Sequence, residues 1–185
     1  MTREQAINIL LDKIKNGVIV ATTGKTSREL FELREKRNEP HDRDFLNIGA
    51  MGCVLSIGLG IALNTKKKVF VLDGDGSALM KMGSFATVGY YAPKNLVHII
   101  LDNKSYDSTG GQTTSSKTVD WKSIFQGANY KKSIYIDSEK ELNFDNLQGP
   151  VGVVMAVKKG ARSNLGRPAS TPIQIKESFM RFLKK

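Results

Sequence analysis

The sequence predicts an α/β protein with a doubly wound, mostly parallel sheet that is covered by helices on both faces. Short β-branched runs without polar alternation indicate parallel strands that are buried on both sides. Segments with a helical period lie between these runs, and alternating strands and helices are typical of this fold class. The length of 185 residues fits one domain with a substantial core, so we expect residues 1–185 to form a single unit.

Five segments have the length and composition of buried strands: residues 18–21, 68–73, 97–102, 133–136 and 151–157. Five others have a helical pattern: residues 3–15, 27–36, 52–64, 77–91 and 172–183. Pro93 ends the fourth helix, and Thr171 is a good N-cap for the fifth. Residues 107–118 are rich in Gly, Ser and Thr, and we expect a long mobile loop there.

The formal net charge of +10 favours an anionic cofactor, an anionic substrate or an acidic partner. The lysines and arginines are spread along the chain without interleaved aromatics, which argues against nucleic-acid binding. No apolar run reaches the ~18 residues that a membrane span needs. The first residues lack a signal peptide's apolar stretch, so we expect a cytoplasmic protein. A single cysteine, Cys53, and two histidines leave little material for a cysteine or histidine metal centre.

Two nucleotide-binding patterns are incomplete. Gly24-Lys25-Thr26 ends like a P-loop, but Ile19 stands where that motif needs a glycine. Gly58 and Gly60 begin a dinucleotide fingerprint inside a helical pattern, and position 63 is a leucine. Tight packing of that helix explains these glycines better.

A stronger signal lies at the ends of two successive strands. Asp75, within Gly74-Asp75-Gly76-Ser77, stands where a buried strand ends and a helix begins, and Asn103 follows the next strand. Free N–H groups and the positive end of a helix dipole suit an anion at such a turn. Adjacent parallel strands bring these two ends together, and oxygen ligands from aspartate, asparagine and a carbonyl suit Mg²⁺. The alternative is a tight strand–helix turn with an unrelated asparagine after it.

The pair of motifs resembles the fingerprint of thiamine-diphosphate-dependent enzymes. That resemblance implies Mg²⁺ ligation by Asp75, Asn103 and the carbonyl of Ser105, with Gly74, Gly76 and Ser77 around the diphosphate. Asp102 replaces the first asparagine of the usual Asn-Asn pair, at a position that is not a ligand.

A second stretch, Leu46-Asn47-Ile48-Gly49-Ala50-Met51, is similar to the same family. By that resemblance, the carbonyl of Gly49 accepts a hydrogen bond from the aminopyrimidine of the cofactor. Met51 would hold the cofactor in its bent, reactive form, although it also suits an ordinary core position. Thr23, Gly24 and Lys25 would lie over the cofactor.

Within the family, the chain resembles the diphosphate-side half of the phosphonopyruvate decarboxylases in residues 22–31, 107–112 and 165–172. The resemblance implies decarboxylation of phosphonopyruvate to phosphonoacetaldehyde. The β subunit of sulfopyruvate decarboxylase, another 2-oxo acid decarboxylase, and a non-catalytic module that binds an anion or nucleic acid remain alternatives. Ser108, Thr109 and Gln112 are expected either to contact the substrate or relay protons, or to form only a lid. Lys25 or Lys104 would offset the phosphonate charge.

Enzymes of this family take the glutamate that activates the cofactor from a pyrimidine-side domain, which the sequence before Gly17 is too short to provide. The resemblance therefore implies a partner domain or subunit, in a homo- or hetero-oligomer. We expect the isolated chain to be inactive.

Overall fold

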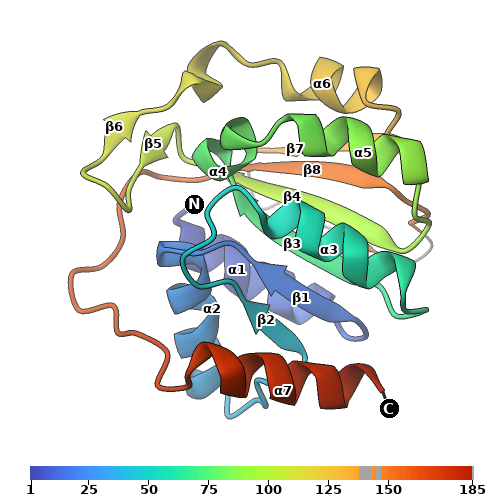
Figure 1. Ribbon diagram of the computed structural model, residues 1–185. Helices are drawn as coiled ribbons and strands as arrows, with labels where there is room; N and C mark the ends of the chain where they lie inside the picture. The colour runs from blue at the N-terminus through green and yellow to red at the C-terminus, as the bar shows by residue number, and fades with distance from the viewer. Residues whose placement is uncertain (138–142, 145–146, 185) are drawn as a thin grey trace.

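The computed structural model describes residues 1–137, 143–144 and 147–184, in which parallel strands form a central sheet (Figure 1). The sheet has six strands in the order β2-β1-β3-β4-β8-β7, and every neighbouring pair is parallel. Its strands are β1 (Val18–Ala21), β2 (Asp44–Leu46), β3 (Val69–Gly74), β4 (Leu96–Asp102), β7 (Lys132–Ile136) and β8 (Val151–Ala156). The order reverses at β1, so the carboxyl ends of β1, β3 and β4 open onto one edge of the sheet, where such folds bind ligands.

Helices cover both faces of this sheet, with α1 behind it and α3 and α5 in front of it in Figure 1. The helices are α1 (Arg3–Lys13), α2 (Lys25–Lys36), α3 (Val54–Leu63), α4 (Asp75–Met80), α5 (Gly83–Tyr91), α6 (Trp121–Gly127) and α7 (Pro172–Leu183). A short antiparallel pair, β5 (Ser105–Tyr106) and β6 (Gln112–Thr113), and a 3₁₀ turn, η1 (Ser115–Thr118), follow β4.

The strands bury alternate residues in two separate cores, as the pleat of a sheet requires. In β1, Ile19 and Ala21 face the core beneath α1 and α2, whereas Val18 and Val20 face the core beneath α3 and α5. Both sets are fully buried. This double burial is why the strands are continuously apolar and do not alternate with polar residues.

The expected fold class is confirmed, and the expected strands all form. β2, the β5–β6 pair and α6 were not predicted from the sequence. The single helix predicted over residues 77–91 is two helices, α4 and α5, which are separated at Lys81 and Met82. Residues 107–118 are correspondingly not one continuous loop, because β6 and η1 lie within them. The helix predicted from Ser27 begins at Lys25. Thr171 caps α7 as expected, in a reciprocal pair with Gln174.

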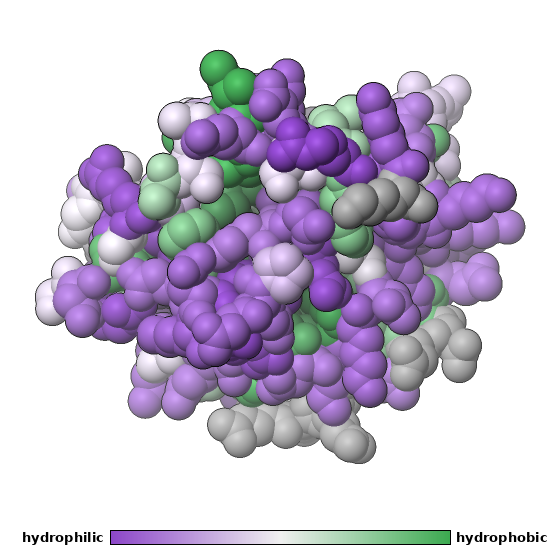
Figure 2. Space-filling model, turned by 90° about the horizontal axis from the view of Figure 1, so that it is seen from below, coloured by the Kyte–Doolittle hydropathy of each residue, from purple (hydrophilic) through white to green (hydrophobic). Residues whose placement is uncertain are grey.

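Hydrophilic residues cover most of the face on which α7 lies (Figure 2). Within the described residues, none of the helices combines the length and the apolar character that a membrane crossing requires.

Close packing of α3 on the sheet explains one of its two glycines. A Cβ atom at Gly58 would lie 2.2 Å from a methyl group of Val71 in β3. At Gly60, two residues further along the same helix, a Cβ atom would meet nothing within 4 Å. The Gly-Leu-Gly pattern is therefore a packing feature at its first position only.

These two glycines form a matched pair for mutation. We expect Gly58→Ala to lower the free energy of unfolding by about 1–3 kcal/mol, because the added methyl group overpacks the contact with β3. Gly60→Ala should leave stability unchanged or raise it by about 0.5–1 kcal/mol, since alanine is the better helix former. Urea denaturation followed by circular dichroism measures both, and equal effects would contradict the packing assignment.

Candidate cofactor site

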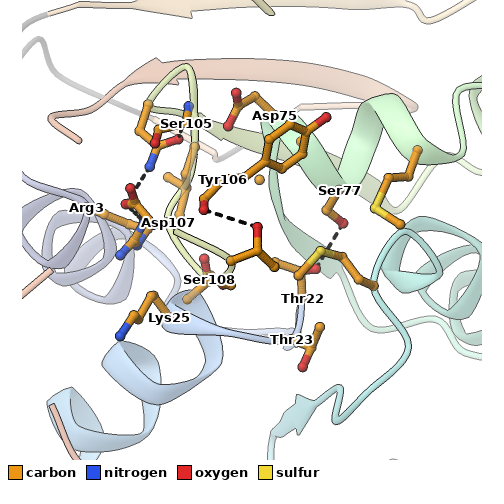
Figure 3. Close-up of a pocket in the computed structure, with 18 of the residues that line it drawn as sticks. Arg3, Thr22, Thr23, Lys25, Asp75, Ser77, Ser105, Tyr106, Asp107 and Ser108 are labelled. Atoms are coloured by element: carbon orange, nitrogen blue, oxygen red, sulfur yellow. Dashed lines mark hydrogen bonds and ion pairs between the residues drawn. The ribbon is translucent and has the colours of Figure 1, made fainter. Parts of the chain in front are cut away.

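A cavity of about 540 Å³ lies at the carboxyl ends of β1, β3 and β4, where the sequence predicted a ligand site. In Figure 3, Asp75 and Ser77 lie across the cavity from Thr23 and Lys25, and Arg3 and Asp107 close one side. The predicted site residues that line it are Thr23, Lys25, Met51, Gly74, Asp75, Gly76, Ser77, Asn103, Ser105, Ser108, Thr109 and Gln112.

Three predicted site residues do not line this cavity: Gly24 and Gly49, which were expected to contact the cofactor, and Lys104, which was expected to offset the substrate charge. Gly24 lines a second cavity beside it, and Gly49 is linked to the wall through its N–H, which donates to the hydroxyl of Thr23 at 3.1 Å. Lys104 lines neither cavity, so the hypothesis that it offsets substrate charge has no support from its position.

Asp75 is a buried carboxylate at the first position of α4, and only 2% of the residue is exposed. Burial raises its pKa to about 6, and the negative charge of Asp102 adds to this rise. Its carboxylate accepts hydrogen bonds from the hydroxyl of Thr114 and from the N–H groups of Gly76 and Asn103. No ion pair joins it to a cation among the residues that the structure describes. A buried charge of this kind requires compensation, and a divalent cation would provide it.

Asn103 is held beside Asp75 by bonds on both sides of its amide. Its Oδ1 accepts from the N–H of Ser105 at 3.0 Å, and its Nδ2 donates to Oδ2 of Asp107 at 2.6 Å. Because a carbonyl oxygen has two lone pairs, Oδ1 keeps one for a metal ion. The predicted convergence of the strand ends is thus present, since the N–H of Asn103 already contacts the carboxylate of Asp75.

Asp107 anchors this arrangement to the start of the chain. Its Oδ2 also accepts from Arg3 at 3.1 Å and from the N–H of Gly160 at 2.9 Å. Arg3 in turn is ion-paired with Glu29 of α2 at 2.7 Å, and both side chains are buried. The amide of Asn103 is therefore oriented through a chain of charged groups from α1, α2 and the loop after β8.

The serine hydroxyls of the cavity indicate where a ligand fits. Ser77 Oγ bonds to Thr22 Oγ1 at 3.0 Å and to the N–H of Gly52 at 3.1 Å, which joins the three loops. Ser105 Oγ is buried without a hydrogen-bond partner among the described residues. An unpaired carboxylate, an amide oxygen and an unsatisfied hydroxyl in one cavity suit a hard cation with a phosphate group. No cluster of three or more His, Cys, Asp or Glu capable of holding a metal occurs in the described part of the chain.

Two glycines of the turn have different roles. A Cβ atom at Gly76 would lie 2.4 Å from the ring of Tyr106, which packs against the turn, whereas one at Gly74 would meet nothing within 4 Å. Gly76 is therefore required by protein packing, and Gly74 leaves open space in the cavity. The residues fit a thiamine diphosphate with Mg²⁺ by donor chemistry and by space.

Among the residues that shape the site, five that were not predicted are Arg3, Thr22, Tyr106, Asp107 and Thr114. Arg3 lies on the same helical stripe as Ala6 and Ile7, and a cation on an apolar stripe is a signal that could have identified it. Thr22 follows the predicted strand of residues 18–21, whereas the other three lie in the segment after the predicted strand of residues 97–102. The sequence alone does not distinguish them from ordinary loop residues.

Comparison with known proteins identifies the family to which the chain belongs. Residues 22–164 match the family described as thiamine pyrophosphate enzyme, C-terminal TPP binding domain. The chain is 42% identical to a phosphonopyruvate decarboxylase of Streptomyces viridochromogenes over 98% of this chain and 46% of that protein. It is 34% identical to sulfopyruvate decarboxylase subunit beta of Methanococcus maripaludis over 100% of this chain and 99% of that subunit. The chain thus spans less than half the length of the phosphonopyruvate decarboxylase.

A solved structure supports the fold. An enzyme from Mycobacterium smegmatis, described as thiamin diphosphate-dependent, superposes with a TM-score of 0.62 at 17% sequence identity. The match covers 86% of this chain and 32% of that one.

The raised pKa of Asp75 leads to a stability prediction for the chain without cofactor or metal. The carboxyl has a pKa of about 6 in the folded chain and near its ordinary 3.8 when unfolded, so folding is opposed increasingly as the pH rises from about 4 to 6. Above pH 6 the cost is complete and amounts to as much as about 3 kcal/mol. Asp75→Asn removes the charge. We expect this variant to have a higher free energy of unfolding than the parent near pH ~8, and the difference to be smaller near pH ~5.

Thermal or urea unfolding at the two pH values measures this difference. Asp137→Asn, at an exposed aspartate, serves as the control and should show no such gap. A difference between Asp75→Asn and the parent that does not widen with pH would contradict the prediction.

Proposed function

This chain belongs to the thiamine pyrophosphate enzymes, and we propose that it is the diphosphate-side half of a decarboxylase that acts on phosphonopyruvate. The buried and unpaired carboxylate of Asp75, held against Asn103 at the ends of two adjacent strands, carries this proposal. This arrangement supports the binding of a Mg²⁺ ion that the diphosphate of the cofactor would also coordinate. When bound, thiamine diphosphate supplies an electron sink for the carbanion that decarboxylation leaves.

The residues of this chain would then bind and orient. Asp75, Asn103 and the carbonyl of Ser105 would hold the metal ion, and Ser77 with the N-terminus of α4 would hold the diphosphate. Met51, which lines the cavity, would support the cofactor in its bent form. Thr23, Gly24 and Lys25 form the opposite wall, with Gly49 behind Thr23.

The loop after β4 is proposed to contact the substrate. Ser108, Thr109 and Gln112 line the cavity, and Thr109 and Gln112 bond to each other's side chain or backbone. Their hydroxyl and amide groups can donate to a carboxylate or relay a proton. The loop also limits access of water to the site.

A partner is part of the proposal. No glutamate lines the cavity among the described residues, and the activating glutamate would come from a pyrimidine-side domain or subunit. Two observations support this: the chain corresponds to 46% of the Streptomyces phosphonopyruvate decarboxylase, and the Methanococcus relative is named as a subunit. The assembly is then a homo- or hetero-oligomer.

The second candidate is sulfopyruvate decarboxylation. It is favoured by the match to the Methanococcus subunit beta, which the chain covers over 99% of its length. The higher identity to the phosphonopyruvate decarboxylase, 42% against 34%, is the reason to place the phosphonate first.

Loss of the metal ligand should remove cofactor binding. In the chain assembled with a pyrimidine-side partner, we expect Asp75→Ala to weaken Mg²⁺-dependent binding of thiamine diphosphate by about a hundredfold or more, since even outer residues of metal sites contribute about 10–100-fold. Titration calorimetry with and without Mg²⁺ measures this, and Asp137→Asn should bind like the parent. Equal affinity of Asp75→Ala and the parent would refute the site.

Turnover should depend on the partner. We expect the assembly to decarboxylate phosphonopyruvate with a higher kcat/KM than sulfopyruvate, and the isolated chain with thiamine diphosphate and Mg²⁺ to be inactive, because half of the cleft is absent. A coupled aldehyde assay on both preparations provides the comparison. Robust turnover by the isolated chain would refute the need for a partner, and steep salt-dependent binding of DNA without cofactor binding would favour a nucleic-acid module.

A further inference from the structure

We propose that the anionic headgroup of the substrate binds in a second cavity, where Lys25, Arg28 and Arg167 converge beside the cofactor cavity. This inference rests on the proposed function and adds to it the residues that recognise the phosphonate. The second cavity has a volume of about 360 Å³. Its lining contains three cationic side chains and no acidic one among the described residues.

Within the described residues, no carboxylate neutralises the positive charge of this cavity. Neither Lys25 nor Arg167 has a carboxylate partner among the described residues. Arg28 bonds only to backbone carbonyls, with Nε donating to Gly166 at 2.5 Å and Nη2 donating to Leu165. Four other arginines have carboxylate partners within the described residues, as with Arg3 and Glu29 or Arg34 and Asp44, whereas Arg43 and Arg181 have none. Three cationic side chains without carboxylate partners around the second cavity favour the binding of an anion there.

The cavity is built by contacts that fix its far wall. Arg28 holds the carbonyls that precede Arg167, and Glu32, one turn further along α2, accepts from the N–H of Gly166. Arg162 donates to the same Glu32. The backbone before Arg167 is therefore tied to α2, which places Arg167 beside Arg28 in the lining of the cavity.

The two cavities lie side by side. Thr23, Lys25 and Ser108 line both of them. The loops that carry these residues meet at Gly24, where a Cβ atom would lie 2.4 Å from the hydroxyl of Ser108 and where φ is +97°. Only glycine allows this approach without strain. A short 2-oxo acid with an anionic group on its third carbon would thus have its keto group on the cofactor side and its anion on the arginine side.

The charge of the cavity also bears on the choice of anion. A phosphonate, like a phosphate monoester, carries up to two negative charges near neutral pH, whereas a sulfonate carries one. The planar fork of an arginine donates two parallel hydrogen bonds to such oxygens. Two arginines and a lysine therefore favour the dianion over the monoanion.

The test uses Arg167, which is exposed and outside the cofactor contacts, in the chain assembled with its pyrimidine-side partner. We expect Arg167→Ala to raise the KM for phosphonopyruvate by about tenfold to a hundredfold and to leave the KM for pyruvate, which lacks the phosphonate, unchanged. Arg167→Lys should recover part of the loss, because it keeps the charge without the fork. Arg181→Ala, at an exposed arginine of α7, is the matched control.

Binding of methylphosphonate and methanesulfonate, measured by titration calorimetry on the same assembly, separates this inference from the proposed function. Methylphosphonate that binds more tightly than methanesulfonate, and only when Arg167 is present, supports the cavity even if turnover fails. If thiamine diphosphate binds and turnover proceeds but Arg167→Ala changes neither KM nor methylphosphonate binding, the inference is overturned and the proposed function stands. An equal rise in KM for pyruvate would also overturn it.

Discussion

The uncompensated carboxylate of Asp75 is the constraint on which the site depends. The fold buries it at the start of α4, with hydrogen bonds but without a described cation, so that its pKa rises to about 6. A buried carboxylate of this kind lowers the stability of the fold, and buried charges in proteins are normally paired or bound to a metal ion. The loops around it are fixed by the protein alone, through Thr22, Ser77 and the Arg3–Asp107 ion pair. These contacts within the protein shape the cavity.

The sequence was sufficient for β1, β3, β4 and β8 because these strands are buried on both faces and so are continuously apolar. It was insufficient for elements that depend on tertiary contacts. β2 has only three residues and is stabilised by pairing with β1, and α6 has seven residues beginning at Trp121, after Asp120, whose side chain caps it. Neither is long enough to show a period. The break between α4 and α5 was missed because Lys81 and Met82 suit a helix on their own.

Most of the site could be predicted from the two strand ends, since parallel neighbours bring their carboxyl ends together wherever such a sheet forms. The parts that could not be predicted come from distant positions. Thr114 reaches Asp75 across 39 positions, and Arg3 reaches Asp107 across 104. No local pattern records these contacts. The resemblance to the thiamine-diphosphate fingerprint supplied residue roles that the local chemistry alone left open, among them those of Gly49 and Met51.

The ion pair between Arg3 and Asp107 has a practical consequence for work with this protein. The third residue of the chain orients the amide of Asn103, and the N–H of Lys158 donates to the carbonyl of Met1. A tag joined directly to Met1 would therefore start close to the bonds that shape the cavity. The end of α7 lies away from this edge, as Figure 1 shows, and is the better place for attachment to a resin, a fluorophore or a surface.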